Sequence, residues 1–146
     1  MAETRPDSRP LRPRRAVDAD SEHFADGLDR GKVLIQRCDD CEALRHPPRP
    51  MCPHCRSFAW STVAASGAGT IYSFTAVHYP AWPAFPQPNY VVLVELAEGV
   101  RMVGDLIGAF DPDRVRIGAS VDAEIVADPN DDMLLVRWRL AEAGPA

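Results

Sequence analysis

The sequence predicts a mostly β protein with a short N-terminal helix, a ribbon held by cysteines and a five-stranded barrel of the OB type. Three observations lead to this fold class. All four cysteines fall in two Cys-x-x-Cys pairs between positions 38 and 55. The hydrophobic pattern then changes to a period of two, typical of half-buried strands, and recurs in five segments. The composition, 46% apolar and 25% charged, is that of a globular protein.

Residues 1–17 are predicted to be a disordered tail or linker. They hold five arginines and three prolines but almost nothing apolar, so burial cannot offset the entropy of ordering them. No apolar stretch follows the first charges, as a secretory signal would require, and we expect a cytoplasmic protein. Residues 57–94 contain no charged side chain, yet glycines and prolines interrupt them too often for a membrane span.

Residues 18–32 are predicted to form the N-terminal helix. Ser21 or the aspartate before it can cap the start, and Gly31 can end the helix in a left-handed conformation. Phe24 and Leu28, four residues apart, make its apolar stripe. Because a helix of about three turns is marginal alone, we expect it to dock against another part of the protein.

Residues 33–63 are predicted to be a metal-binding ribbon. Short apolar segments at 33–36 and 58–63 flank the cysteines and can pair around an ion. Each Cys-x-x-Cys turn brings two thiolates to one ion, and two such turns complete a tetrahedral site. The predicted ligands of one structural Zn²⁺ per chain are Cys38, Cys41, Cys52 and Cys55.

Other interpretations of the cysteines remain. Iron fits four thiolates equally well in geometry, whereas zinc is the commoner ion in structural sites. Disulfides are rare in the cytosol, and two facing Cys-x-x-Cys pairs favour metal over redox chemistry. Because four thiolates leave no open position for water, the ion is expected to be scaffolding rather than a catalytic Lewis acid.

Residues 64–141 are predicted to form the barrel. Its alternating segments are Thr70–Tyr79, Tyr90–Leu96, Arg101–Ile107, Ser120–Val126 and Met133–Leu140. Turn-forming residues separate the segments, at 97–99 and 128–132, and a longer turn at 111–114 joins the third to the fourth. This pattern fits a small Greek-key barrel of the OB type, with a fragment of a β-sandwich as the alternative.

No catalytic constellation is evident in the sequence. The four histidines have no spacing that pairs them with a carboxylate, and we expect His54 to face solvent and His78 to be structural in an apolar surround. Neither a Gly-rich phosphate loop nor a Gly-x-Ser-x-Gly motif occurs. We therefore predict no catalytic residue and no enzymatic activity for the chain alone.

The connection between the first two barrel strands, residues 79–90, is the strongest candidate for a binding surface. Four prolines stiffen it, which presents its aromatic side chains at a low ordering cost. The alternative is that Trp82 and Phe85 fold back and cap the barrel. The candidate contacts to a partner or an acyl-CoA are Tyr79, Trp82, Phe85 and Tyr90.

Charge separates the possible ligand classes. Residues 63–146 carry five basic and eleven acidic side chains, a net of −6, which opposes binding to a phosphate backbone. A ribbon and barrel that binds single-stranded nucleic acid is nevertheless the competing hypothesis, because aromatic side chains on an OB face commonly stack bases. A carrier or sensor of CoA is a third possibility.

Several segments together resemble a known family, the acyl-CoA-associated zinc-ribbon and OB-fold proteins known as domain of unknown function thirty-five. The resemblance covers about residues 20–140, and its most specific part is the run Pro-Pro-Arg-Pro-x-Cys-Pro-x-Cys. The segments that carry it are Phe24–Leu28, Gln36–Cys38, Pro47–Cys55, Gly69–His78, Tyr90–Leu96 and Val115–Gly118.

The resemblance implies a helical piece, a rubredoxin-like zinc ribbon and a C-terminal OB barrel. It further implies a non-catalytic subunit that stabilises a thiolase-like enzyme of the sterol-carrier type and shapes its acyl-CoA site. Such enzymes are retro-aldolases acting on side-chain acyl-CoA esters, including steroid ones, or acyltransferases and condensing enzymes. In several relatives the domain follows a hot-dog hydratase, and residues 1–17 resemble such a linker. No nucleic acid or membrane partner is implied.

Two departures from the family pattern stand out. Each Cys-x-x-Cys turn of a zinc ribbon is called a knuckle. Family members usually place glycine after the second cysteine of each knuckle, whereas this sequence has Glu42 and Arg56. If the chain is left-handed there, each non-glycine residue costs about 1 kcal/mol, which predicts weaker zinc affinity. The helix also has His23 and Phe24 where the family commonly has Phe-Trp.

Overall fold

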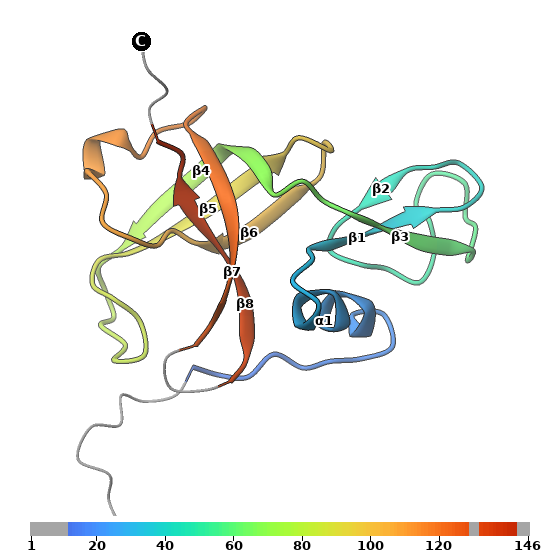
Figure 1. Cartoon of the computed structure of the whole chain (residues 1–146), viewed down its shortest axis with the longest axis horizontal. Coiled ribbons are helices and arrows are strands. Elements are labelled where there is room, and N and C mark those ends of the chain that lie inside the picture. The colour runs from blue at the N-terminus through green and yellow to red at the C-terminus, as the bar shows by residue number, and fades with distance from the viewer. Residues whose placement is uncertain (1–11, 129–131, 143–146) are drawn as a thin grey trace, which may run out of the picture.

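The computed structural model describes residues 12–128 and 132–142. It contains a small three-stranded sheet beside a five-stranded barrel, with one helix packed near the junction (Figure 1). Residues 1–11 of the predicted tail, and the tip of the predicted turn at 128–132, lie outside the described residues. The fold class predicted from the sequence is confirmed.

The small sheet is the ribbon, and its strands have the order β2-β1-β3. Their bounds are Leu34–Cys38 for β1, Leu44–Arg45 for β2 and Trp60–Ala64 for β3. The expected antiparallel pairing of the two segments that flank the cysteines is confirmed by β1 and β3. The sequence did not predict β2, because two residues are too few to establish a periodicity.

The barrel strands have the order β6-β5-β4-β7-β8 and are antiparallel to their neighbours. Their bounds are Ala68–Val77 for β4, Asn89–Leu96 for β5, Arg101–Asp105 for β6, Ser120–Ala127 for β7 and Leu134–Leu140 for β8. A parallel bridge between Leu106 and Trp138 joins the two outer strands and nearly closes the barrel. This closure favours the predicted OB barrel over an open sandwich fragment.

Short connections behave as the turn chemistry predicts. The expected turn after β6 is a 3₁₀ turn at Pro112–Arg114, whose amide at Asp113 donates to the Asp111 carboxylate at 3.0 Å. Gly99 between β5 and β6 has a φ of 87°, which favours glycine in that hairpin.

Helix α1 spans Glu22–Asp29, inside the range predicted for it. Ser21 is its N-cap, but the capping hydrogen bond comes from further back, where the Asp18 carboxylate accepts from the Ser21 amide at 2.9 Å. Gly31 has the predicted left-handed conformation, with a φ of 70°. Gly27 allows the helix to approach β1, since a Cβ atom there would lie 2.7 Å from Cγ of Leu34.

One hydrophobic core joins all three parts. Leu28 of the helix and Val33 and Ile35 beside it in the ribbon belong to the same cluster as the barrel residues Val92 and Trp138. The expected docking of the helix is therefore confirmed, because α1 contacts both β1 of the ribbon and β8 of the barrel, and residues of all three parts belong to the same cluster. Within residues 12–128 and 132–142, no helix has the length and apolar character needed to cross a bilayer.

Candidate docking loop and metal centre

The connection between β4 and β5, residues 78–88, is called here the aromatic-proline loop. Tyr79 and Trp82 keep 87% and 54% of their surface exposed. Phe85 is half-buried, and its amide donates to the Trp82 carbonyl at 2.9 Å, which makes a turn within the loop. Tyr79 and Trp82 thus face solvent, whereas Phe85 folds back.

A hollow of about 380 Å³ lies between this loop and the outer face of the barrel. Its polar side chains include Asn89, which is buried and donates to the Asp105 carboxylate at 3.3 Å. The residues that line it are Val77, Pro80, Trp82, Phe85, Gln87, Asn89, Val91 and Asp105. An apolar recess with few polar groups suits an inserted side chain or a small apolar group.

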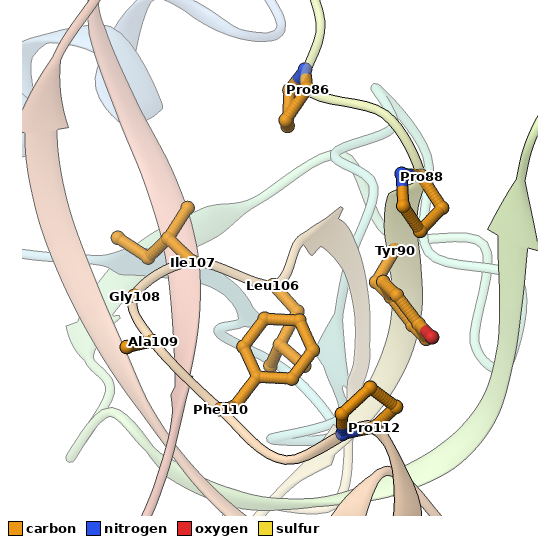
Figure 2. A pocket seen from close by; sticks show the side chains of 9 residues that line it. All are labelled: Pro86, Pro88, Tyr90, Leu106, Ile107, Gly108, Ala109, Phe110 and Pro112. Atoms are coloured by element: carbon orange, nitrogen blue, oxygen red, sulfur yellow. The ribbon is translucent and has the colours of Figure 1, made fainter.

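Tyr90 lies apart from the other predicted contacts. Side chains alternate along β5, so Tyr90 points to the opposite face of the strand from Asn89 and Val91. Its ring meets Phe110 edge to face at 5.2 Å, in a second hollow of about 440 Å³ (Figure 2). Pro86 and Pro88 line this second hollow, so the loop separates the two recesses. The four predicted contact residues therefore do not form one continuous patch.

The histidines fall into two groups. His54 is exposed, as expected, but His78 is exposed too, and the prediction of an apolar surround is wrong because the chain has left β4 at that point. His23 and His46 instead pack between helix and ribbon, with ring centroids 5.0 Å from Trp60 and 5.5 Å from Phe24 respectively. Burial lowers the pKa of both histidines.

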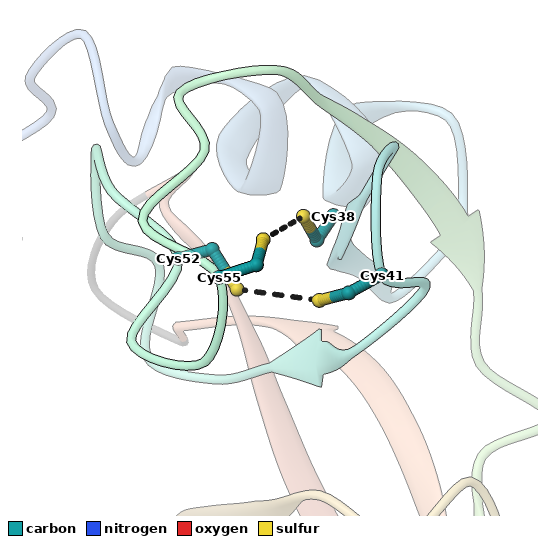
Figure 3. A group of neighbouring side chains, drawn as sticks. All are labelled: Cys38, Cys41, Cys52 and Cys55. Carbon is teal, nitrogen blue, oxygen red and sulfur yellow. Dashed lines mark hydrogen bonds between the residues drawn. The ribbon is translucent and has the colours of Figure 1, made fainter.

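The four cysteines converge at the end of the ribbon (Figure 3). All four Sγ atoms lie within 4.8 Å of one another, with Cys38 to Cys55 at 3.5 Å and Cys41 to Cys52 at 3.6 Å. A disulfide would need about 2.05 Å. A tetrahedral zinc site with Zn–S bonds of about 2.3 Å needs sulfur atoms roughly 3.8 Å apart. The donor set therefore fits a structural Zn²⁺ held by these cysteines.

Backbone amides prepare the first thiol of each knuckle for a metal. The amide of Cys41 lowers the pKa of Cys38, and the amide of Cys55 lowers the pKa of Cys52 to about 6. For Cys55, the Ser57 amide lowers the pKa, but the neighbouring thiols and burial outweigh it and raise the pKa to about 12. Four thiols so close together cannot all ionise without a cation among them.

Gln36 joins the two knuckles behind the cysteines, a role that the sequence did not reveal. This side chain is buried in β1, and its Oε1 accepts from Nε of Arg45 at 2.6 Å and from the Arg49 amide at 2.9 Å. Arg45 also donates to the Arg49 carbonyl at 3.3 Å. The network fixes the chain that leads into the second knuckle. A glutamine directly after the apolar run Val33–Ile35 was the only sequence signal.

Comparison with known proteins supports both units. Residues 25–61 match the family model described as "ChsH2, rubredoxin-like zinc ribbon domain", and residues 62–126 match "ChsH2, C-terminal OB-fold domain". Together with the four converging thiols, the ribbon match identifies the cofactor as a structural zinc ion.

Three curated relatives are similar over most of this chain. A "Probable enoyl-CoA hydratase alpha subunit" of Thermomonospora curvata is 47% identical over 120 residues, and the "3-oxo-4,17-pregnadiene-20-carboxyl-CoA hydratase alpha subunit" of Mycobacterium tuberculosis is 43% identical over 119 residues. The chain matches 82% of its own length to each, but only 37% of theirs. A "DUF35 domain-containing scaffold protein" of Methanocaldococcus jannaschii is 34% identical, with 65% of this chain and 68% of that protein covered.

Two solved structures have the same fold. The chain described as "Ltp2-ChsH2(DUF35) aldolase" superposes with a TM-score of 0.80 at 41% identity, with 87% of this chain and 98% of that chain covered. A DUF35 protein of Sulfolobus solfataricus superposes with a TM-score of 0.60 at 21% identity, with 84% of this chain and 86% of that chain covered. This likeness supports the fold alone. The chain thus belongs to the DUF35 family, with a zinc ribbon and an OB-fold barrel of the ChsH2 type.

Proposed function

We propose that the chain is the accessory subunit of a thiolase-like acyl-CoA lyase, a retro-aldolase that shortens the side chain of a steroid-type acyl-CoA ester. The observation that carries the proposal is the 41% identity to 98% of a chain in the structure named Ltp2-ChsH2(DUF35) aldolase. The relative named as a pregnadiene-carboxyl-CoA hydratase subunit favours a steroid substrate. In this role the chain stabilises the lyase and shapes its acyl-CoA site.

The metal centre supports an accessory rather than a catalytic role. Four thiolates satisfy a tetrahedral ion, so zinc supplies folding energy here and offers no open position to a substrate. The four cysteines hold the ribbon in shape, and the ribbon shares one hydrophobic core with the helix and the barrel. The chemistry of the complex is then assigned to the partner's residues.

The aromatic-proline loop is the surface that we assign to the partner. Cores of interfaces are poor in charge and rich in aromatic side chains, and the loop lies within the charge-free residues 57–94. Exposed Tyr79 and Trp82 are the assigned contacts, and the apolar hollow beside them can receive a side chain of the partner or part of the acyl-CoA.

A hot-dog hydratase domain is the second partner that we propose. Two relatives are named hydratase alpha subunits, and this chain corresponds to 37% of the length of each. Under this proposal, the part of those proteins outside the matched region carries the hydratase activity that their names state. A pull-down of the candidate hydratase with the present chain, followed by a hydration assay, tests it independently of the lyase.

Co-expression with a thiolase-like enzyme encoded beside this chain tests the main proposal. We expect a stable complex in size-exclusion chromatography that cleaves the acyl-CoA, while neither chain alone does so. Acyl transfer or condensation by the complex would instead identify an acyltransferase or condensing enzyme. Turnover of acyl-CoA by the purified chain alone would overturn the accessory role.

Binding to single-stranded nucleic acid is tested by a salt titration. A true backbone contact weakens steeply as salt rises. We expect no binding at physiological salt, because the barrel half carries a net charge of −6. Salt-sensitive micromolar binding would favour the nucleic-acid module over the lyase subunit.

A further inference from the structure

Arg12 precedes all helices and strands of the fold, yet its side chain is buried against the barrel. Its guanidinium lies 2.6 Å from the Asp105 carboxylate and 3.2 Å from the Asp128 carboxylate. Only 11% of the Arg12 side chain and 2% of the Asp128 side chain are exposed. Buried ion pairs of this kind are costly to break from one side, because the remaining charge has lost its water.

Charge balance explains why Arg12 is needed there. Asp105 ends β6, Asp128 follows β7, and Arg137 of β8 lies 3.5 Å from Asp128. Among the residues that the structure describes, these two carboxylates and two guanidiniums form a cluster of balanced charge where three strands meet. Without Arg12 the cluster would hold an excess carboxylate in a site that excludes most water.

The same guanidinium also touches the aromatic-proline loop. Its central carbon lies 4.2 Å from the ring centroid of Phe85, within the range of a cation–π contact. Phe85 and Asp105 both line the hollow beside the loop, and Asp105 accepts from the buried Asn89. Arg12 thus bridges the barrel and the one loop aromatic that folds back.

A second contact fixes the direction of the segment. The Arg15 guanidinium donates to the Leu134 carbonyl, and the Arg15 amide lies 3.5 Å from the sulfur of Met133. Residues 12–15 therefore run past the start of β8 before the chain continues to helix α1 (Figure 1).

We propose that residues 12–17 form a strap and that Arg12 is a positioning residue, which holds the aromatic-proline loop in the conformation that presents Trp82 to a partner. The effect on the partner rests on the proposed function, whereas the ordering of the loop by Arg12 does not. Residues 12–17, part of the predicted linker, then set the shape of the candidate docking surface.

Hydrogen exchange of the Phe85 amide, measured by NMR, tests the ordering of the loop. This amide donates to the Trp82 carbonyl within the loop, so its exchange reports local opening. We expect Arg12→Ala to speed exchange of the Phe85 amide about tenfold. Arg12→Lys keeps the charge but loses the planar guanidinium with its paired N–H donors, and should have an intermediate effect. The matched control is Arg14→Ala, since Arg14 pairs with an exposed aspartate and its removal changes the net charge equally.

The expected result is faster exchange in the loop beyond any change that the melting temperature explains. A lower melting temperature with unchanged exchange of the Phe85 amide would overturn the proposal, because Arg12 would then only stabilise the barrel. If Arg12→Ala does not fold, Phe85→Leu removes the cation–π contact while keeping the cluster intact. That variant is expected to speed exchange of the Phe85-position amide, and unchanged exchange would equally overturn the proposal.

Binding to the co-expressed thiolase-like enzyme provides the second measurement. We expect Arg12→Ala to weaken binding about tenfold, while Arg14→Ala binds like the unmodified chain. Equal binding of both variants would overturn the role of the strap in docking. Failure of the unmodified chain to bind would overturn the proposed function, and the exchange experiment would still decide whether Arg12 orders the loop.

Discussion

Glu42 and Arg56, each placed directly after a knuckle, hold the chain in a conformation that side chains disfavour. Their φ values are 61° and 64°, in the left-handed region where a non-glycine residue costs about 1 kcal/mol or more. The exposed pairing of Glu42 with Arg37 offsets little of this cost. Each knuckle is therefore closed against a local conformational preference.

Replacement of Arg56 by glycine is predicted to stabilise the ribbon. Arg56→Gly should raise the free energy of unfolding by about 1 kcal/mol, because glycine adopts this φ without strain. Thermal denaturation and resistance of zinc to a chelator measure the effect. Arg56→Ala is the control, since it removes the side chain without relieving the backbone; an equal gain from alanine would contradict the argument.

Loss of one thiol is predicted to unfold the ribbon. Cys41→Ser leaves three thiolates for an ion that needs four, so bound zinc should fall from one per chain to well below that, measured by elemental analysis. Proton NMR of β1 and β3 should lose their dispersed signals, because metal binding supplies folding energy there. Soluble, folded wild-type protein without zinc or iron would contradict this prediction.

Stability is predicted to fall on mild acidification through His23 and His46. Burial lowers the pKa of both in the folded state, so below the ordinary value of about 6.5 the unfolded chain binds more protons. This loss begins as the pH drops through that value and levels off below the lowered pKa. The free energy of unfolding should therefore be smaller at pH 5.5 than at pH 7.5.

The variant His46→Phe is expected to reduce that dependence on pH, since phenylalanine keeps the ring against Phe24 and cannot titrate. His54→Phe is the matched control, because His54 is exposed. Protonation of the cysteines weakens zinc binding in all three proteins, so the difference between them isolates the histidines. An unchanged slope in the His46 variant would contradict the assignment.

Individual site residues differed in how far the sequence could predict them. The cysteines follow from spacing, because each pair forms its own local turn. The left-handed positions of Glu42 and Arg56 followed from resemblance and are confirmed. By contrast, Arg12 contacts carboxylates more than ninety residues away, and no local pattern encodes such a distance. His78 was misplaced for a related reason, since burial depends on where a strand ends in space.

The aromatic-proline loop divides its aromatic side chains between two tasks, and substitutions should separate them. We expect Trp82→Ala to cost about 2 kcal/mol or more of association while leaving the melting temperature nearly unchanged, because Trp82 is 54% exposed. Phe85→Ala should lower the melting temperature by about 3 °C or more, since it removes the ring beneath Arg12. Calorimetric titration and thermal denaturation measure the two effects.

A reversed pattern would assign Trp82 to the barrel cap and move the docking surface to the helix or the ribbon. The matched exposed control is Tyr72→Ala on β4, which keeps the loop intact. Loss of association in this control alone would place the partner on the exposed face of β4 around Tyr72 instead.

At the level of elements, strands were the most predictable part. Five alternating segments in the sequence correspond to β4 through β8, because one buried face imposes a period of two. The inward row of β8 is an example, with Trp138 and Leu140 buried as the pattern requires. The loop between β4 and β5 was less predictable, since proline content indicates stiffness but not which aromatic side chain turns inward.

Unfolding of the whole molecule is predicted to be one cooperative event. Helix, ribbon and barrel share a core, so a strain at their junction should propagate to all of them. Gly27→Ala would place a Cβ atom 2.7 Å from Cγ of Leu34 and 2.9 Å from the Lys32 carbonyl. Such overpacking costs about 1–3 kcal/mol.

The indole NMR signal of Trp138 in the barrel and the release of zinc from the ribbon should shift together in the Gly27 variant. Two separate transitions would mean that ribbon and barrel are independent units. The matched control is Ala109→Gly, because Ala109 is exposed and lies outside every helix and strand.

The sequence of the aromatic-proline loop also determines how readily proteases can cut it. Exposed loops are the usual sites of proteolytic nicking, and this one exposes Tyr79 and Trp82. Trypsin-like enzymes find no lysine or arginine between residues 57 and 94. Chymotrypsin-like enzymes require an aromatic residue, yet Tyr79, Trp82 and Phe85 are each followed by proline, which blocks cleavage. We therefore expect the exposed loop to resist both classes of protease in the isolated chain, which limited proteolysis measures.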